Sequence, residues 1–144
     1  MNVGGVDKAC KSCECSLQLP ALSYRLMSEF RFMKLRVYQD AKTLHRKIVF
    51  LTKDFPKEFL YLKDQLRRAV LSVALNIAEG SAKDSDKDFN RYIQNALGFI
   101  SESAACVDIA KNESLISIDK ADECLRDILR IKDSLGAFSK TLKS

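Results

Sequence analysis

The sequence predicts an all-α protein: an antiparallel, up-down-up-down four-helix bundle with an irregular N-terminal extension. Four segments carry apolar residues at alternating steps of three and four, which places those residues on one side of a helix. The turns between the segments are short, and helices of similar length joined by short turns pack antiparallel. Only 5 Gly and 2 Pro occur in 144 residues, and no alternating strand pattern of useful length is present.

Residues 1–32 show no sustained periodicity, so we predict an unpatterned leader there and a four-helix bundle domain over residues 33–144. The leader is interpreted either as a flexible tail or as an extension that arises from a start codon assigned too early. Met27 and Met33 both stand just before the ordered pattern, in agreement with the second interpretation.

The five cysteines do not form a disulfide framework, since three crowd the leader and two lie inside helical patterns: Cys10, Cys13, Cys15, Cys106 and Cys124. The leader cluster has metal-ligand character, but no fourth ligand is apparent, so we predict no metal site. No apolar run approaches the roughly 18 residues of a membrane span, and no secretory signal is visible. We therefore expect a cytoplasmic protein without membrane contact.

The first helix is expected over residues 34–53. Its apolar seam suits a left-handed bundle and comprises Val37, Ala41, Leu44, Ile48 and Leu51. Phe55-Pro56 ends this segment, because the residue before proline is pushed out of the helical region.

The second helix, residues 62–80, has three stripes where an ordinary amphipathic helix has two. One is apolar and faces inward: Leu62, Leu66, Ala69, Val70, Val73 and Ile77. A polar stripe lies beside it: Gln65, Arg68, Ser72, Asn76 and Glu79. A second apolar stripe lies roughly opposite the first: Leu71, Leu75 and Ala78. Gly80 is expected to end the helix, because glycine adopts positive φ without steric cost.

The third helix is expected over residues 86–111, with Ser85 as its N-cap. Gly98 in its middle costs roughly 1 kcal/mol relative to alanine, which predicts a packing reason for it. The fourth helix begins at a Ser117 or Asp119 cap. Its seam comprises Ala121, Leu125, Ile128, Ile131, Leu135 and Phe138.

Several of these residues form a string that resembles a known signature. Asp64-Gln65-Leu66, Arg68-Ala69, Ser72 and Asn76-Ile77-Ala78-Glu79-Gly80 resemble the signature of the 23S rRNA intervening-sequence protein family. The likeness extends to Leu35-Arg36-Val37-Tyr38-Gln39 upstream, and to Ser85, Lys87, Asp88-Phe89 and Arg91-Tyr92 downstream. It covers roughly residues 30–131, and residues 1–26 match nothing.

The resemblance implies an antiparallel four-helix bundle that assembles into a homo-oligomeric ring, commonly a pentamer. It also implies a relation to the accessory protein of diversity-generating retroelements, which binds nucleic acid. No catalytic activity is associated with the family.

Nothing in the sequence points to catalysis. His45 is the only histidine, and its place beside the first seam indicates a packing residue. Cys106 and Cys124 have no histidine at a suitable spacing and are expected to be small core residues. No phosphate loop, metal-ligand set or nucleophile motif is present, so we predict no enzyme, no cofactor and no small-molecule substrate.

The polar stripe, with Gly80 at its end, has two interpretations. In the first, Arg68, Asn76 and Glu79 form hydrogen bonds to another subunit or to a ligand. In the second, the polar side chains of the stripe are paired within the subunit and hold the second helix against the third, with Glu79 pairing Arg91. A buried charge without a partner costs several kcal/mol, so both interpretations require partners. We favour the second, with subunit assembly as its extension through Leu71, Leu75 and Ala78.

Five basic residues cluster around the end of the second helix and the start of the third: Arg67, Arg68, Lys83, Lys87 and Arg91. They are candidate contacts to RNA or DNA, although Asp84, Asp86 and Asp88 lie among them and a solvated mixed-charge face is the alternative. The sequence thus predicts a non-enzymatic, ring-forming protein associated with nucleic acid. The alternative is an oligomeric scaffold or adaptor that acts through protein contacts only.

Overall fold

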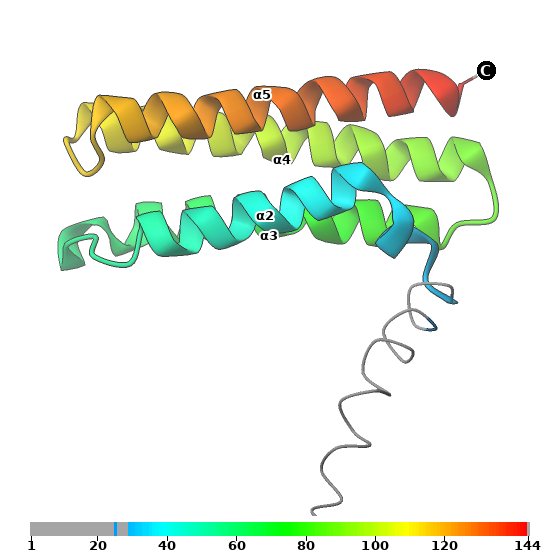
Figure 1. Cartoon of the computed structure of the whole chain (residues 1–144), viewed down its shortest axis with the longest axis horizontal. Coiled ribbons are helices and arrows are strands. Elements are labelled where there is room, and N and C mark those ends of the chain that lie inside the picture. The colour runs from blue at the N-terminus through cyan, green and yellow to red at the C-terminus, as the bar shows by residue number, and fades with distance from the viewer. Residues whose placement is uncertain (1–24, 26–28, 144) are drawn as a thin grey trace, which may run out of the picture.

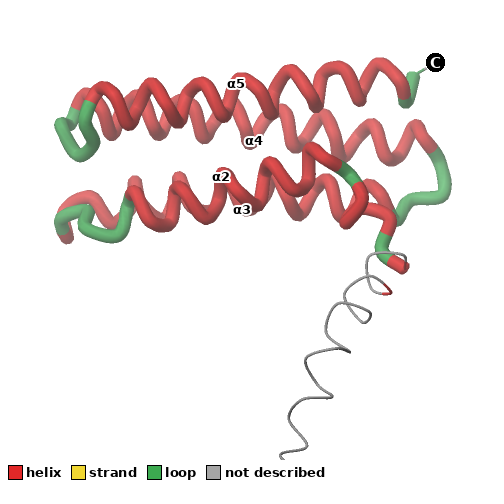
Figure 2. The backbone as a smooth tube through the Cα atoms, in the orientation of Figure 1, coloured by secondary structure: helices red, strands yellow, loops and turns green. Residues whose placement is uncertain are grey.

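The computed structural model describes Arg25 and residues 29–143 of the chain. The predictions for residues 1–24, including the cysteine cluster, lie outside the described residues. The elements, in chain order, are η1 (Arg31–Lys34), α2 (Arg36–Leu51), η2 (Lys57–Phe59), α3 (Leu60–Ser81), α4 (Asp86–Asn112) and α5 (Ile118–Thr141). No strand occurs among these residues (Figure 2).

The four long helices pack as an antiparallel bundle, as predicted (Figure 1). Each helix contacts two others, in the cycle α2, α3, α4, α5 and back to α2. The α3–α4 contact is the most extensive, and the contact that closes the cycle between α2 and α5 is the least extensive. The connecting turns lie at alternating ends of the bundle (Figure 2).

The helix bounds of α2, α3 and α4 differ from the predicted ones by at most two residues at either end. The short η1 turn before α2 was not predicted from periodicity. The Gln39 side-chain amide donates a hydrogen bond of 2.8 Å to the Met33 carbonyl, which ties η1 to the first turn of α2. This hydrogen bond therefore fixes the direction in which the chain enters α2.

Serine caps begin the two C-terminal helices. The Ser85 hydroxyl accepts from the Asp88 backbone N–H at 3.1 Å, and the Ser117 hydroxyl accepts from that of Lys120 at 3.4 Å. Each hydroxyl satisfies one of the N–H groups that a helix leaves unpaired at its start. Ser117, and not Asp119, is thus the cap of α5.

The core combines the inward stripes predicted for α2, α3 and α5 with the buried face of α4. Fully buried residues from all four helices include Ala41, Ile48, Leu66, Val70, Val73, Ile77, Phe89, Ile93, Ile100, Val107, Cys124 and Leu135. Burying a side chain of the size of Val, Leu, Ile or Phe contributes roughly 1.5–3 kcal/mol. Leu51, Leu125 and Phe138 belong to the same seams but are only partly buried.

Gly80 has a different role from the predicted one. It lies inside α3, is buried, and does not have a positive φ. A Cβ atom there would stand 2.6 Å from Phe89 Cδ2 and 2.7 Å from Tyr92 Cβ. Gly80 therefore lets α3 and α4 approach closely next to their connecting turn.

The packing reason expected for Gly98 is absent within the chain. Gly98 is exposed on α4, and a Cβ atom there would meet nothing within 4 Å. The expectation was wrong for the single subunit, because this part of α4 faces away from the other three helices.

Candidate functional site

The polar stripe of α3 is only partly satisfied inside the subunit. The Gln65 amide donates to a carboxylate oxygen of Glu102 on α4, and the Asn76 amide donates to the Ser72 carbonyl at 2.8 Å. Arg68 and Glu79 are exposed and have no hydrogen bond or ion pair to any described residue. The stripe thus joins α3 to α4 at Gln65, and its two charged residues face solvent.

The expected pair between Glu79 and Arg91 is not formed. The Arg91 guanidinium lies 3.5 Å from Asp88, one turn earlier on α4. Asp88 also accepts a hydrogen bond of 2.8 Å from the Ser85 hydroxyl. Arg91 therefore pairs with an acid of its own helix, and Glu79 on α3 does not contact it.

The second apolar stripe of α3 is open to solvent in the subunit. Leu71 is 42% exposed and Leu75 is 48% exposed, and Ala78 is half-buried. Arg68 lies one turn before Leu71, and Glu79 lies one turn after Leu75. We name this surface the α3 outer face, made of Arg68, Leu71, Leu75, Ala78 and Glu79.

The five residues predicted as basic contacts are not all displayed on one surface. Arg67 is turned inward: its guanidinium donates to Thr52 Oγ1 at 2.8 Å and to the Val49 carbonyl at 2.9 Å, which joins α3 to the C-terminal turn of α2. The Lys83 ammonium lies 5.1 Å from the centre of the Tyr92 ring. Lys87 and Arg68 are exposed.

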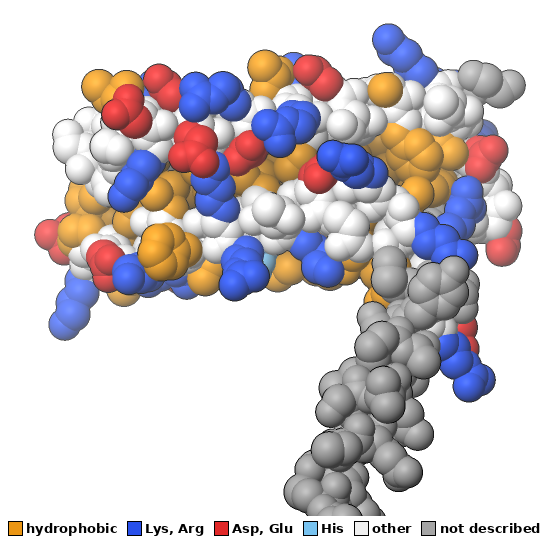
Figure 3. Space-filling model, viewed as in Figure 1, with side chains coloured by type: hydrophobic (Ala, Val, Ile, Leu, Met, Phe, Trp, Pro, Cys, Tyr) orange, Lys and Arg blue, Asp and Glu red, His pale blue; other side chains and the backbone are white. Residues whose placement is uncertain are grey.

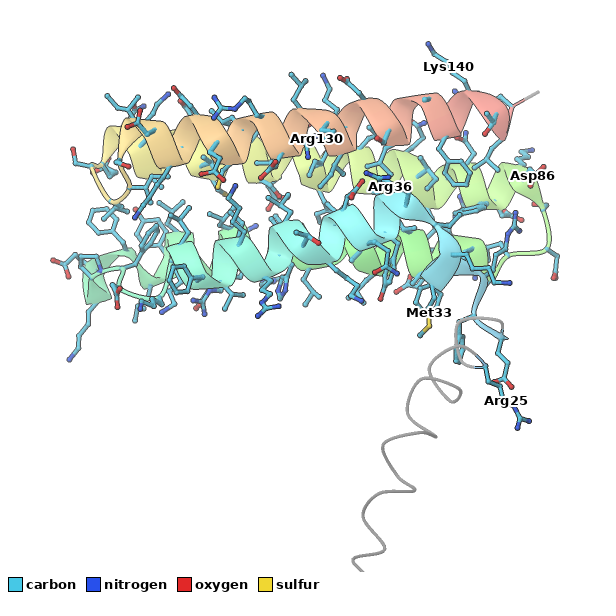
Figure 4. All side chains as sticks on the ribbon, in the orientation of Figure 1. Arg25, Met33, Arg36, Asp86, Arg130 and Lys140 are labelled. Carbon is cyan, nitrogen blue, oxygen red and sulfur yellow. The ribbon has the colours of Figure 1, made fainter. Side chains whose placement is uncertain are left out.

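The charges at the α3–α4 end also cancel. Lys83, Lys87 and Arg91 are interspersed with Asp84, Asp86 and Asp88, so the charges of three cations are balanced by those of three carboxylates. Figure 4 marks Asp86 at the start of α4, on the outside of the turn. This end of the bundle therefore presents a mixed-charge surface.

The basic surplus of the bundle lies elsewhere. Residues 30–59, which hold η1, α2 and η2, carry eight lysines and arginines against three acids, a surplus of five. Residues 60–143 carry thirteen lysines and arginines against thirteen acids, a surplus of zero. Figure 3 shows the same asymmetry, with blue side chains and few red ones along α2 and a mixture of both over α5.

A cluster of charges closes the seam between α2 and α5. The Lys47 ammonium lies 2.7 Å from Asp127 and also bonds Glu123, and Arg130 lies 3.4 Å from Asp127 on the side of α5 that faces α2 (Figure 4). The cluster borders a small hollow of about 70 Å³. Burial acts to lower the pKa of Lys47, but the hydrogen bonds to Asp127 and Glu123 outweigh it and raise that pKa. The Lys47 ammonium thus helps to hold α2 against α5 and is not free to bind a ligand.

The residues considered for catalysis are packed. Cys106 and Cys124 are free and buried, and burial raises the pKa of both thiols. His45 is half-buried on α2. Over Arg25 and residues 29–143, no group of three or more His, Cys, Asp or Glu side chains is placed to hold a metal ion. No helix in that part of the chain is long and apolar enough to cross a membrane.

Sequence reasoning did not identify two features. The inward hydrogen bonds of Arg67 depend on Thr52 and Val49, which are fifteen or more residues away, so no local pattern reveals them. The basic surplus of residues 30–59 could have been found from the sequence alone, by counting the charges of each segment.

The family comparison agrees with the fold and with the position of the signature string. Residues 33–137 match the 23S rRNA-intervening sequence protein family. A search of curated proteins found no match. The matched range includes all four long helices except the last turn of α5, and the chain therefore belongs to the 23S rRNA-intervening sequence protein family.

Proposed function

We propose that this chain is a non-enzymatic nucleic-acid-binding protein that works as a homo-oligomer. The observation that carries the proposal is the uneven charge: the whole basic surplus of residues 30–143 lies in residues 30–59, and the rest is neutral. Clustered lysine and arginine side chains neutralise phosphates and give affinity without reading sequence. The family name, which refers to 23S rRNA, agrees with an RNA partner.

The proposed action is binding without catalysis. The one histidine of the chain is half-buried, and both described cysteines are buried, so none of them is displayed to a substrate. We place the protein in the reducing cytoplasm, in keeping with the free thiols of Cys106 and Cys124.

Assembly is proposed to use the α3 outer face. Two leucines exposed side by side on a helix, with a charge at either end of the patch, form the apolar centre and polar rim of a protein contact. Arg68 and Glu79 have no partner within the described residues, so both are available to bond a second copy. A ring, with a pentamer as the expected form, requires this face of each copy to meet a different surface of the next copy.

The assembly test is a pair of charge substitutions. Leu71→Asp with Leu75→Asp should reduce the mass measured by light scattering from that of an oligomer to about that of the 16.3 kDa chain, with unchanged helical circular dichroism. The matched control is Ile109→Asp with Leu129→Asp, at residues 45% and 52% exposed on α4 and α5. A monomeric wild type, or a Leu71/Leu75 variant that keeps the wild-type mass, would contradict the assignment.

Nucleic-acid binding is tested by mobility shift with RNA and DNA at about 50 and about 200 mM salt, because phosphate contacts weaken steeply as salt rises. The proposal predicts retardation at the lower concentration and marked loss at the higher one. Absence of retardation at both would refute nucleic-acid binding. It would leave the second candidate, an oligomeric scaffold or adaptor, which the α3 outer face supports independently.

A further inference from the structure

One face of α2, together with the turn that follows it, carries three cations and a phenyl ring in a single row. Lys42, Arg46, Phe50 and Lys53 follow one another at steps of four, four and three, and all four are exposed. At 1.5 Å per residue each four-residue step advances about 6 Å along the helix axis, so the row is continuous. We name it the α2 cationic face.

We propose that the α2 cationic face binds single-stranded nucleic acid, with the three cations on phosphates and Phe50 stacked on a base. This inference rests on the proposed nucleic-acid binding and gives it a place on the molecule and a strand preference. It differs from the site expected at the α3–α4 turn, where the cations and acids cancel.

The cations of this face are available to a ligand. Arg46 has no hydrogen bond or ion pair to any described residue. The Lys42 ammonium makes only a long contact of 3.4 Å to the Gln39 side chain and lies 5.6 Å from the centre of the Tyr38 ring. Lys53 lies 3.8 Å from Asp54, whose side chain is 86% exposed, so water screens that pair.

Along residues 40–54, acids stand only at the two ends of the row. Asp40 lies 3.8 Å from Arg36, and Asp54 follows Lys53, whereas residues 41–53 contain no acid. The other cation of that segment, Lys47, is held on the α5 side by Glu123 and Asp127 and does not belong to the face. Lys63 of α3 adds a cation beside Lys53, because its ammonium lies 3.4 Å from the Lys53 carbonyl.

Phe50 indicates the kind of strand. It is 71% exposed, more than any other large hydrophobic side chain among the described residues. The Lys53 ammonium lies 4.9 Å from its ring centre, so a cation and an aromatic surface are presented together. Bases of a single strand are free to stack on such a ring, whereas bases of a duplex are already stacked on each other.

The charge contribution is tested with Lys42→Gln, Arg46→Gln and Lys53→Gln in one chain. The control, Lys120→Gln, Arg126→Gln and Lys132→Gln, removes the same charge from exposed positions of α5. Affinity for a fluorescein-labelled oligouridine of about 16 nucleotides is measured by anisotropy over a salt series from about 50 to about 200 mM. Three lost phosphate contacts on a single strand should reduce the slope of log K against log salt by about 2, and the α5 control should keep the wild-type slope.

The stacking contribution is tested with Phe50→Ala. This change should weaken oligouridine binding about tenfold and leave the salt slope unchanged, since no charge is lost. Leu129→Ala, at an exposed position of α5, is the control and should bind as the wild type does. Circular dichroism and light scattering of each variant confirm that fold and assembly are retained.

The outcomes separate this inference from the function on which it rests. If the wild type binds no oligouridine, no single-stranded DNA and no duplex, nucleic-acid binding itself is refuted and this site with it. If the wild type binds but the α2 variant has the same slope and affinity as the α5 control, the site is refuted and the function stands. Tighter binding of a duplex than of its single strands, together with no effect of Phe50→Ala, would overturn the single-strand assignment.

Discussion

Replacing Gly80 with alanine should destabilise the bundle, although alanine is the better helix former. The added Cβ atom would lie 2.6 Å from Phe89 Cδ2 and 2.7 Å from Tyr92 Cβ. Carbon atoms in contact are normally about 3.5–4.0 Å apart, so both neighbours must retreat by about 1 Å. Tyr92 Cβ is fixed to the α4 backbone, and the buried Phe89 ring packs edge-on against Phe138 with centroids 5.1 Å apart. Relief therefore requires α4 to move away from α3.

The two opposing effects differ in size. Alanine gains about 1 kcal/mol over glycine inside a helix. Inserting a methyl group into a packed contact costs about 1–3 kcal/mol, and a rigid contact such as this one is expected at the upper end. The net loss is about 2 kcal/mol, or roughly 8 °C in melting temperature at about 4 °C per kcal/mol for a domain of this size.

Gly98→Ala is the matched control, because the same chemical change meets nothing within 4 Å there. It should stabilise the chain by about 1 kcal/mol through helix propensity alone. Both variants are compared with the wild type by urea unfolding followed by circular dichroism, at equal protein concentration because the proposed assembly would make stability depend on concentration. A Gly80→Ala protein as stable as the wild type, or two variants that shift in the same direction by equal amounts, would refute the packing explanation.

Two further predictions concern the seams on either side of α2. Arg67→Met keeps an aliphatic stem but loses the hydrogen bonds to Thr52 and Val49, which should cost about 2 kcal/mol in urea unfolding. Arg126→Met, at an exposed position of α5 outside the proposed subunit contact, should cost less than about 0.5 kcal/mol, and equal losses would contradict the role given to Arg67. The pKa of Lys47 is raised above its ordinary value of 10.5, so its stabilising contribution is complete below that pH and disappears as pH rises through the raised value. The stability difference between wild type and Lys47→Met should therefore be constant from neutral pH to about 10 and shrink as pH rises above 10.5, and a difference that stays constant or grows over that alkaline range would show the sign to be wrong.

Most of the fold follows from local patterns in the sequence. Apolar steps of three and four predicted the helices, Pro56 predicted the end of α2, Ser85 predicted the start of α4, and a cap at Ser117 or Asp119 predicted that of α5. These signals are local, because a cap or a helical face is defined by residues within one or two turns of each other.

The features that were missed depend on contacts between helices. Gly80 was assigned to a helix end from its conformational freedom, but its position is fixed by Phe89 and Tyr92 on the next helix. Arg67 was counted as a free cation, but the ends of α2 and α3 meet so that its guanidinium reaches Thr52. Residue type and spacing do not show which way such a side chain turns.

One of the two candidate surfaces could be predicted from local sequence patterns, and the other could not. The outward position of Leu71 and Leu75 follows from helical periodicity, and the structure places both in solvent. The basic contacts were predicted near the family signature, where the charges cancel, while the surplus lies in residues 30–59, which include α2. A count of charges along the chain locates the basic surplus. The packing of α2 then shows which of those cations are exposed: Lys47 is paired with acids of α5, whereas the Arg46 side chain faces solvent.

Photocrosslinking of RNA to the full chain, followed by mass spectrometry of tryptic peptides, tests the proposed nucleic-acid contact most directly. Trypsin releases residues 48–53 as one peptide that contains Phe50. Uridine crosslinked to that peptide, and lost from it in the Phe50→Ala protein, is the predicted result. RNA that crosslinks only to residues 83–91 or to α5 would contradict the assignment of nucleic-acid binding to α2.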